Sequence, residues 1–299
     1  MKWYFASNDK SPKYDALIKA AVESALQNTS LEPYFIYDGD LNNPLIKWLE
    51  TKGVKIIPHR VNFYNVIKSH PHEKYISIAS GAFLRCDIPI LNTEDDFVLY
   101  TDCDVIFLKD FDYKNLEQPE YFSCSSENNP DDFENFNTGV MYMNLKKLRE
   151  SHREFTDFIT ANLYDLAAFD QTAYQMFYGS KMTPLPIQYN YKPYWKMDEN
   201  AVIIHFHGPK PFDFESDSHI VNFPGTYKYL FNIRPKNYLH YLELFKKYSP
   251  NITYSEEFLK KLEQLGKNKR YFTTPLRVRI KNFARKKLLP LLLSNRKNS

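Results

Sequence analysis

Short apolar segments typical of β-strands alternate with amphipathic segments typical of helices along the first third of the chain. Trp3 to Ala6, Tyr34 to Tyr37 and Val54 to Ile57 are expected to be strands. Apolar residues recur at helical spacing from Tyr14 to Leu26, and the segment Pro44 to Lys52 has proline early and glycine just past its end. Repeated strand–helix–strand units build a parallel sheet covered by helices on both faces. We therefore predict an α/β fold with a mostly parallel sheet.

Further elements are expected downstream. Tyr75 to Leu84 reads as a helix, and helical spacing also follows Leu145. The strands expected in this part are the one that ends at Asp102, Tyr121 to Cys124, Gly139 to Met143, and Ala201 to Ile204. The region 222–260, rich in tyrosine and phenylalanine, is expected to be helical in part.

The composition places the chain among globular proteins. Its 299 residues are 43% apolar, enough for one large domain or two small ones with a core. Only 8 residues are glycine and no GxGxxG or Walker-type loop occurs, so a glycine-cradled nucleotide site is not expected. Three cysteines without metal-ligand spacing, no cleavable apolar leader and no bilayer-length apolar stretch favour a reducing cytosol.

Charge is distributed unevenly along the sequence. All 36 acidic residues lie at or before Glu263, whereas 11 of the 39 lysines and arginines follow it. The body therefore has a formal charge of −8 and the tail one of +11. We expect residues 1–265 to form the folded domain and residues 266–299 to form a separate basic segment.

Cations and large aliphatic residues are mixed in this basic segment, between Thr274 and Leu293. The mixture is typical of an anchor at the interface of an anionic membrane, where each Lys or Arg contributes about 1 kcal/mol. Nucleic acid is the competing partner, because polycations bind phosphate generally. The aliphatic end favours the membrane surface, and no nucleic acid is expected. A helix packed on the acidic body is the structural alternative.

Two aspartates, Asp102 and Asp104, interrupt the apolar run from Phe97 to Phe107. Ligands of open α/β sheets bind at the carboxyl ends of strands, and two carboxylates on a short turn suit Mg²⁺ or Mn²⁺ holding a diphosphate. An exposed acidic turn is the alternative. The same spacing also occurs at Asp38 and Asp40 and at Asp110 and Asp112. Apolar segments on both sides favour the pair at 102 and 104.

Four further segments carry side chains that suit a phosphosugar site. Asn137 precedes a predicted strand, where its amide can bind hydroxyl groups or simply begin the strand. Asp170 and Gln171 lie at a predicted helix start, where the aspartate can equally be the N-cap. Arg85 can be an ordinary surface arginine. The fourth segment ends an apolar strand with His205, His207, Gly208 and Lys210, which offer an imidazole ligand, a close backbone approach and a phosphate counter-charge.

The order of these segments resembles that of the retaining GT-A glycosyltransferases of family 8, which includes glycogenin and bacterial lipopolysaccharide α-glucosyl- and α-galactosyltransferases. The likeness covers residues 1–215. The matching pieces are Phe5-Ala6-Ser7-Asn8-Asp9, the helix around Arg85, Tyr100-Thr101-Asp102-Cys103-Asp104, Phe136-Asn137-Thr138-Gly139, Asp170-Gln171, and His205 to Pro211. The resemblance implies a Rossmann-like GT-A fold.

The resemblance also implies a role for each matching residue. Asp102, Asp104 and His205 would hold Mn²⁺ or Mg²⁺ against the diphosphate of a UDP-sugar. Contacts to the donor would come from Ala6, Asn8, Arg85, Cys103, Gly208 and Lys210. Asn137, Asp170 and Gln171 would lie beside the sugar ring and the reacting carbon. Asp170 or Gln171 would act as nucleophile in a double displacement, or support a front-face reaction.

Two positions depart from the family pattern. Glycine and lysine are usually two residues apart in HxxGxxKPW, whereas one residue separates Gly208 from Lys210 here, which leaves both His205 and His207 as possible metal ligands. Asn8 also stands where aspartate is common in the bacterial members.

The expected activity is transfer of a hexose, glucose or galactose, from a UDP-sugar to a glycan or glycolipid acceptor in lipopolysaccharide or capsule synthesis. The expected location is cytoplasmic, peripheral on the inner face of a bacterial membrane. The alternatives are a haloacid-dehalogenase-like phosphatase, which also places DxD after a strand, and a non-catalytic glycan- or membrane-binding protein.

Overall fold

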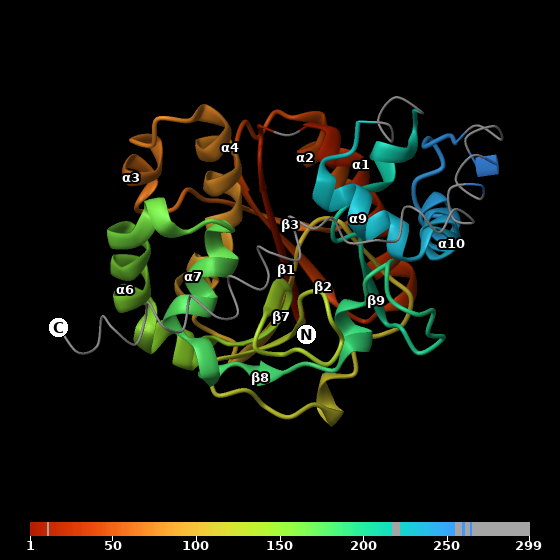
Figure 1. Ribbon diagram of the computed structural model, residues 1–299. Helices are drawn as coiled ribbons and strands as arrows, with labels where there is room; N and C mark the ends of the chain where they lie inside the picture. The colour runs from red at the N-terminus through yellow and green to blue at the C-terminus, as the bar shows by residue number, and fades with distance from the viewer. Residues whose placement is uncertain (11, 217–221, 255–258, 261–263, 265–299) are drawn as a thin grey trace.

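The computed structural model describes residues 1–10, 12–216, 222–254, 259, 260 and 264, and its centre is a seven-stranded sheet (Figure 1). The strand order is β3-β2-β1-β4-β7-β6-β8. The strands are β1 (Lys2–Asn8), β2 (Glu32–Asp38), β3 (Lys55–Pro58), β4 (Phe97–Thr101), β6 (Phe122–Ser126), β7 (Phe136–Asn144) and β8 (Thr183–Pro184). A two-stranded sheet pairs β5 (Val105–Phe107) with β9 (Ile203–His205).

The first four strands of the large sheet are parallel, as the alternation of strand and helix predicts. β1 pairs in parallel with β2 and with β4, and β2 pairs in parallel with β3. The next strand, β7, runs in the opposite direction, because it is antiparallel to both β4 and β6, and β6 pairs in parallel with β8. The predicted α/β fold is confirmed, and the sheet changes from parallel to antiparallel at the β4–β7 pair.

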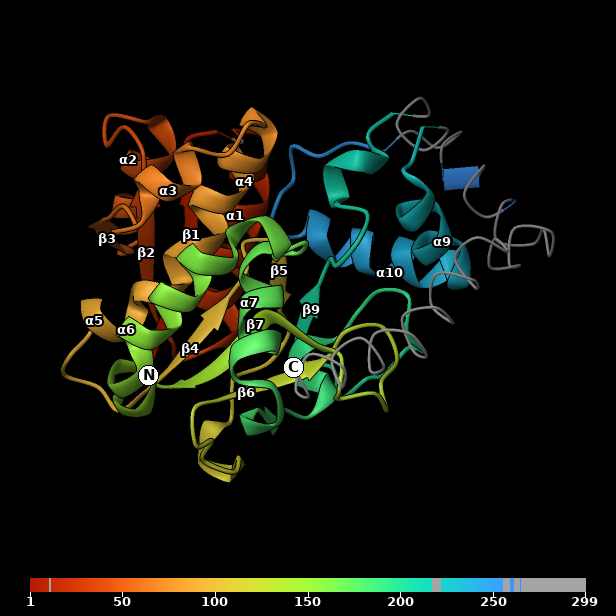
Figure 2. The same cartoon turned by 60° about the vertical axis from the view of Figure 1, so that its left-hand side comes forward.

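Helices cover both faces of the sheet (Figures 1 and 2). The helices are α1 (Asp15–Asn28), α2 (Pro44–Thr51), α3 (Tyr64–Lys68), α4 (Glu73–Ala82), α5 (Ile88–Leu91), α6 (Leu145–Asn162), α7 (Phe169–Phe177), α9 (Gly225–Ile233) and α10 (Pro235–Lys246), with the 3-10 turn η2 (Phe83–Asp87) between α4 and α5. Both helices predicted in the first third, α1 and α2, are present. Leu26 is an exception to the buried face expected for the first of them, because it is 42% exposed.

Alternate residues of β1 point to opposite faces of the sheet, as the period of a strand requires. Trp3 and Phe5 pack with residues of α1 and α2, and Trp3 stacks on Phe5 at 4.5 Å between ring centroids. Tyr4 packs on the other face with residues of α4, α6 and α7. Removing a fully buried ring such as that of Phe5 would cost about 3–5 kcal/mol of folding free energy.

A third hydrophobic cluster lies beside the sheet and includes residues of α9 and α10. It joins Ile106 of β5 and Ile204 of β9 to Leu17 of α1 and to Phe206, just after β9. The strand predicted at 201–204 therefore exists, but it begins at Ile203 and ends at His205. No helix among the described residues is both long and apolar enough to cross a bilayer. The basic segment 266–299 lies outside the described residues.

Candidate active site

The turn between β4 and β5 carries Asp102, Cys103 and Asp104 at the carboxyl end of a central parallel strand. Three contacts fix its shape. The Asp102 amide donates to the Gly139 carbonyl at 2.8 Å, the Asp104 carbonyl accepts from the Phe206 amide at 2.8 Å, and the Cys103 thiol donates to the Ala6 carbonyl at 3.2 Å. The turn is therefore attached to β7, to the end of β9 and to β1.

His205, the last residue of β9, brings an imidazole to this turn. Its Nε2 lies 3.3 Å from Asp104 Oδ1 and 3.9 Å from Asp102 Oδ2. Each of the three residues offers a ligand atom, and these atoms lie within 4.8 Å of one another. His207 is not part of this group, because its Nε2 contacts Glu127 Oε1 at 3.0 Å. The geometry therefore places His205, rather than His207, with the two aspartates.

A chain of hydrogen bonds fixes the orientation of the His205 ring. The Asn137 side-chain amide donates to the Glu127 carboxylate at 2.9 Å, and the Asn137 oxygen accepts from Asn190 Nδ2 at 2.9 Å. Asn190 Oδ1 then faces His205 Nδ1 at 2.9 Å. A carboxylate only accepts hydrogen bonds, so the NH₂ group of Asn137 faces Glu127 and its oxygen faces the NH₂ group of Asn190. The oxygen of Asn190 then faces His205, so the imidazole carries its proton on Nδ1.

Nε2 of His205 consequently keeps a lone pair that points to the carboxylates, which is the tautomer of a metal ligand. Burial, opposed by Asp104, lowers the pKa of His205 and so also favours the neutral ring. Two carboxylates and one neutral imidazole form a donor set that fits Mn²⁺ or Mg²⁺. These residues can therefore hold the divalent cation that the sequence predicts.

Two cations, one buried and one partly buried, contact the same carboxylates. Arg85, which is 5% exposed, donates to Asp102 Oδ1 at 2.6 Å and lies 3.1 Å from Asp170 Oδ2. Lys210 forms an ion pair with Asp104 and donates to the Phe206 carbonyl at 2.9 Å. Burial disfavours the charged form of Asp104, but the Lys210 ammonium acts in the opposite direction and the pKa of Asp104 lies well below its usual range. Arg85 is thus a buried part of the site and not a surface residue.

Asp170 lies in the first turn of α7, next to Arg85, and is 5% exposed. The N-cap of α7 is Ala168, whose side chain makes no capping hydrogen bond. The alternative prediction, that Asp170 is the N-cap of this helix, is therefore wrong. Asp170 Oδ2 instead accepts from the Thr138 hydroxyl at 3.1 Å. Burial raises the pKa of Asp170 to about 6, although Arg85 acts in the opposite direction.

Gln171 and Asn137 bind each other and share one carboxylate. Asn137 Nδ2 donates to Gln171 Oε1 at 3.0 Å, and Gln171 Nε2 donates to Glu127 Oε2 at 2.9 Å. Burial acts against ionisation of Glu127, but His207 and other partners lower its pKa to about 2. The ionised Glu127 therefore holds both amides in position.

The sequence interpretation missed Glu127 and two residues on the segment before β9. Asn190 is fully buried, and Lys192 is fully buried with its ammonium bound to the carbonyls of Ser126 and Asn190 at 3.1 and 2.9 Å. Burial lowers the pKa of Lys192 to about 7. Glu127 lies in a polar loop where acidic residues are ordinary, so neither spacing nor periodicity distinguishes it.

The expected nucleotide contacts lie where β1 ends. Asn8 Nδ2 donates to the Ser77 carbonyl at 2.7 Å and to the Ser80 hydroxyl at 2.9 Å, so this side chain is fixed against α4.

Gly208 has a φ of +93°, a conformation that favours glycine, and it lies between His207 and the loop that carries Lys210. A backbone turn that favours glycine therefore follows His205.

The two further acidic pairs and a pocket lie away from the candidate metal centre. Asp38 is paired with Arg60, and Asp110 and Asp112 bind Ser30 and Asn115, so both further acidic pairs have local partners.

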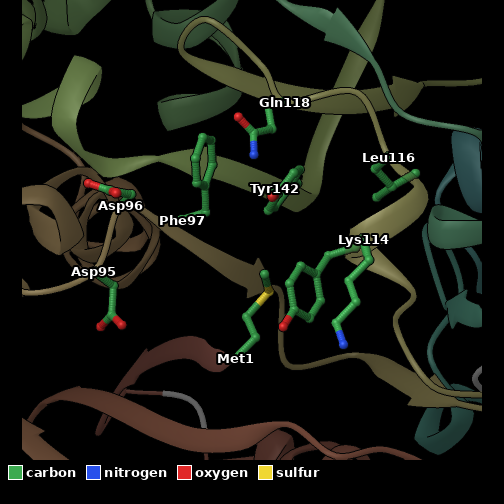
Figure 3. Close-up of a pocket in the computed structure, with 9 residues that line it drawn as sticks. Met1, Asp95, Asp96, Phe97, Lys114, Leu116, Gln118 and Tyr142 are labelled. Carbon is green, nitrogen blue, oxygen red and sulfur yellow. The ribbon is translucent and has the colours of Figure 1, made fainter.

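A pocket of about 500 Å³ lies where β1 and β4 begin, at the end of the sheet opposite Asp102 (Figure 3). Its lining includes Met1, Asp95, Asp96, Phe97, Lys114 and Tyr142.

The fold and the site define a glycosyltransferase of the GT-A type. The family model described as glycosyl transferase family 8 matches residues 13–214, and the chain belongs to this family. The resemblance that the motifs carry is confirmed, and the phosphatase and non-catalytic alternatives are not supported. No curated protein sequence matches the chain.

Solved structures of glycosyltransferases share the fold. Galactosyltransferase LgtC, in complex with donor and acceptor sugar analogs, is 16% identical, with a TM-score of 0.58 over 87% of this chain and 100% of that one. Glycosyltransferase GlyE of Streptococcus pneumoniae TIGR4 is 19% identical, with a TM-score of 0.55 over 70% of this chain and 55% of that one. Mouse xyloside xylosyltransferase 1 is 16% identical, with a TM-score of 0.51 over 69% of this chain and 97% of that one. The chain thus matches only about half of the length of GlyE.

Proposed function

We propose that the chain is a metal-dependent retaining glycosyltransferase that moves a hexose, glucose or galactose, from a UDP-sugar to a glycan or glycolipid acceptor. The observation that carries the proposal is the convergence of Asp102, Asp104 and His205 at the carboxyl end of β4. The family match supports it, and so does LgtC, whose structure holds donor and acceptor sugar analogs.

Mn²⁺ or Mg²⁺, when bound to these three residues, supplies Lewis-acid stabilisation of the departing diphosphate. Lys210 and Gly208 would contact the diphosphate, because the lysine is held beside Asp104 and the glycine allows a close backbone approach. Arg85 would neutralise Asp102 and Asp170 together, which keeps their carboxylates in place before the donor binds.

The sugar ring would lie against Asn137, Asp170 and Gln171. Glu127 holds both amides, so their polar atoms are oriented in advance of substrate binding. Asp170 or Gln171 would act as nucleophile or stabilise positive charge at the reacting carbon. Ala6, Asn8 and Cys103 would lie on the nucleotide side, where β1 ends beside the metal-binding turn.

Calorimetry of Mn²⁺ and UDP binding tests this proposal. Asp102→Asn should weaken binding by at least about 100-fold, because a direct ligand contributes at least as much as its supporting partners, which cost 10- to 100-fold. Asp102 is the better variant, since its side chain is 30% exposed, whereas Asp104→Asn also leaves Lys210 without its carboxylate. Asp112→Asn, in the acidic pair with the same spacing, is the matched control. Unchanged affinity in Asp102→Asn would contradict the metal assignment.

We also propose that residues 1–265 are the transferase domain and that residues 266–299 hold it on the inner, anionic face of a bacterial cytoplasmic membrane. The opposite formal charges of the two parts, −8 and +11, support this division. A membrane-embedded glycolipid acceptor of lipopolysaccharide or capsule synthesis fits such a location. Nucleic acid binding is not part of the proposal.

A further inference from the structure

Three aromatic rings form a stack beside the amino-terminal turns of α4 and α7. His70 lies between the other two rings, with its centroid 3.9 Å from Tyr75 and 5.2 Å from Tyr164. The interplanar angles are 17° and 24°, so all three rings are close to parallel. The Tyr75 hydroxyl donates to the Leu163 carbonyl at 2.9 Å, which anchors the inner end of the stack.

The outer ring of the stack is Tyr164, which is 67% exposed. One face of this ring lies against His70, so the stack holds the ring in a fixed plane while most of its surface meets solvent. Single exposed aromatic side chains are ordinary on protein surfaces, and Tyr164 differs from them because the stack holds its ring. The faces of aromatic rings carry negative charge density, which attracts the weakly positive C–H groups of an apolar pyranose face.

The inner end of the stack leads to the candidate active site. The ring of Tyr75 lies 5.0 Å from that of Phe169, the residue directly before Asp170. Phe169 has a φ of +50°, and it is the one non-glycine residue with positive φ among those that the structure describes. Such strain persists only where surrounding contacts hold it, and it gathers at functional sites.

A second connection between the stack and the site runs through α4. Tyr75 belongs to the first turns of α4, and Ser77 and Ser80 of the same helix bind Asn8 at the end of β1. α4 also contacts α7, and the two helices lie close together on one side of the sheet (Figures 1 and 2). The stack is therefore attached to both the expected nucleotide side and the expected sugar side of the site.

We propose that Tyr164, held by His70 and Tyr75, is an acceptor subsite that binds a pyranose ring of the acceptor glycan by stacking. The inference rests on the proposed transferase function and adds the acceptor-binding surface to it. The stack is assigned to the acceptor and not to the donor, because its exposed end is separated from Asp170 by two rings and Phe169.

The test is saccharide binding by saturation-transfer NMR in the presence of UDP and Mn²⁺. The ligands are the methyl glycosides of glucose and galactose, lactose and maltose, with the open-chain polyol sorbitol as the negative control. Tyr164→Ala should weaken saccharide binding about 3- to 10-fold, the value expected for one lost aromatic contact. Tyr164→Phe should bind as the wild-type protein does, since stacking needs the ring and not the hydroxyl.

Met176→Ala is the matched control, because Met176 is 52% exposed and lies on α7, away from the stack. Hydrolysis of UDP-glucose and UDP-galactose without acceptor should be equal in the wild-type protein and Tyr164→Ala. Equal saccharide affinity in these two proteins, or no preference of the wild-type protein for the saccharides over sorbitol, would overturn the subsite. Absence of UDP-hexose hydrolysis by the wild-type protein would instead count against the proposed function, while saccharide binding still decides the subsite.

Discussion

Gly139 shows how one residue determines the geometry of the candidate metal centre. A Cβ at this position would lie 2.2 Å from His205 Cε1 and 2.9 Å from Asn137 Oδ1. Real Cβ atoms do not approach neighbours so closely, and the His205 ring has little room to move because Asn190 binds its Nδ1 and Asp104 lies 3.3 Å from its Nε2. Glycine is needed here for the close approach of a strand to the imidazole.

We therefore predict that Gly139→Ala displaces His205 and weakens Mn²⁺ and UDP binding by about 10- to 100-fold, as the loss of a ligand-orienting contact does. Calorimetry measures the affinity, and thermal unfolding separates this effect from a loss of structure. Gly225→Ala is the control, because a Cβ at Gly225 meets no atom within 4 Å. Equal affinity in both variants would show that the ring can move aside.

At the scale of the elements, the 3-10 turn η2 carries both Arg85, which reaches the site, and Asp87, which binds the turn to other elements. Asp87 is 1% exposed, and its carboxylate accepts from His59 at 2.7 Å and from His152 at 2.8 Å. These histidines belong to the segment after β3 and to α6. The turn that positions Arg85 is thus tied to two elements far apart in the sequence.

This arrangement predicts a pH dependence of stability. Burial alone raises the pKa of Asp87, but the hydrogen bonds from His152 and His59 outweigh it and hold the pKa below its usual range. The carboxylate therefore contributes stability above its unfolded pKa of about 3.9, and this contribution is lost as the pH falls through the lower, folded pKa.

Urea unfolding of Asp87→Asn should show a loss of about 1–3 kcal/mol at neutral pH and a smaller further loss in acid than the wild-type protein. Asp157→Asn is the control, because Asp157 is 74% exposed and lies on α6 opposite Arg153. An Asp87→Asn variant as stable as the control at neutral pH would contradict the proposed role of the two histidines.

At the scale of the whole molecule, the site lies where the sheet changes direction. The metal-binding turn follows β4, which is parallel to β1 on one side and antiparallel to β7 on the other. Residues from β1, β7, α7 and β9 therefore reach one place, although their positions in the sequence span nearly two hundred residues. The charge of the chain is divided at the same scale, between an acidic body and the basic segment 266–299.

The charge division predicts salt-sensitive binding to anionic vesicles. Replacing Arg285, Lys286 and Lys287 by glutamine in the full chain should remove about 3 kcal/mol of attraction, since each cation contributes about 1 kcal/mol. Vesicle co-sedimentation measures the loss. The control replaces Lys10, Lys147 and Arg153, which are exposed cations of the body. Equal binding of the two variants, or stronger binding of the wild-type protein to nucleic acid than to lipid, would exclude the membrane proposal.

The sequence by itself determined the parallel half of the sheet and the place of the acidic turn. The continuous apolar run from Trp3 to Ala6 marks a strand that is buried on both faces, and the helical spacing that follows marks the buried side of the first helix. Burial dominates the folding of such segments. The apolar run around Asp102 and Asp104 likewise marks a strand end that carries two carboxylates. These are local patterns, so they can be identified without any knowledge of distant partners.

Only the tertiary structure decided which polar side chains complete the site. Glu127 and Lys192 lie in loops, and Asn190 ends the 3-10 helix η6 (Ile187–Asn190). Polar residues in such segments have no period that marks them as buried. His205 and His207 are alike in the sequence, and strand pairing of β9 with β5 places only the first beside the aspartates. The physical reason is that a hydrogen bond requires two atoms at a fixed distance and angle, and that geometry exists only after distant segments have packed together.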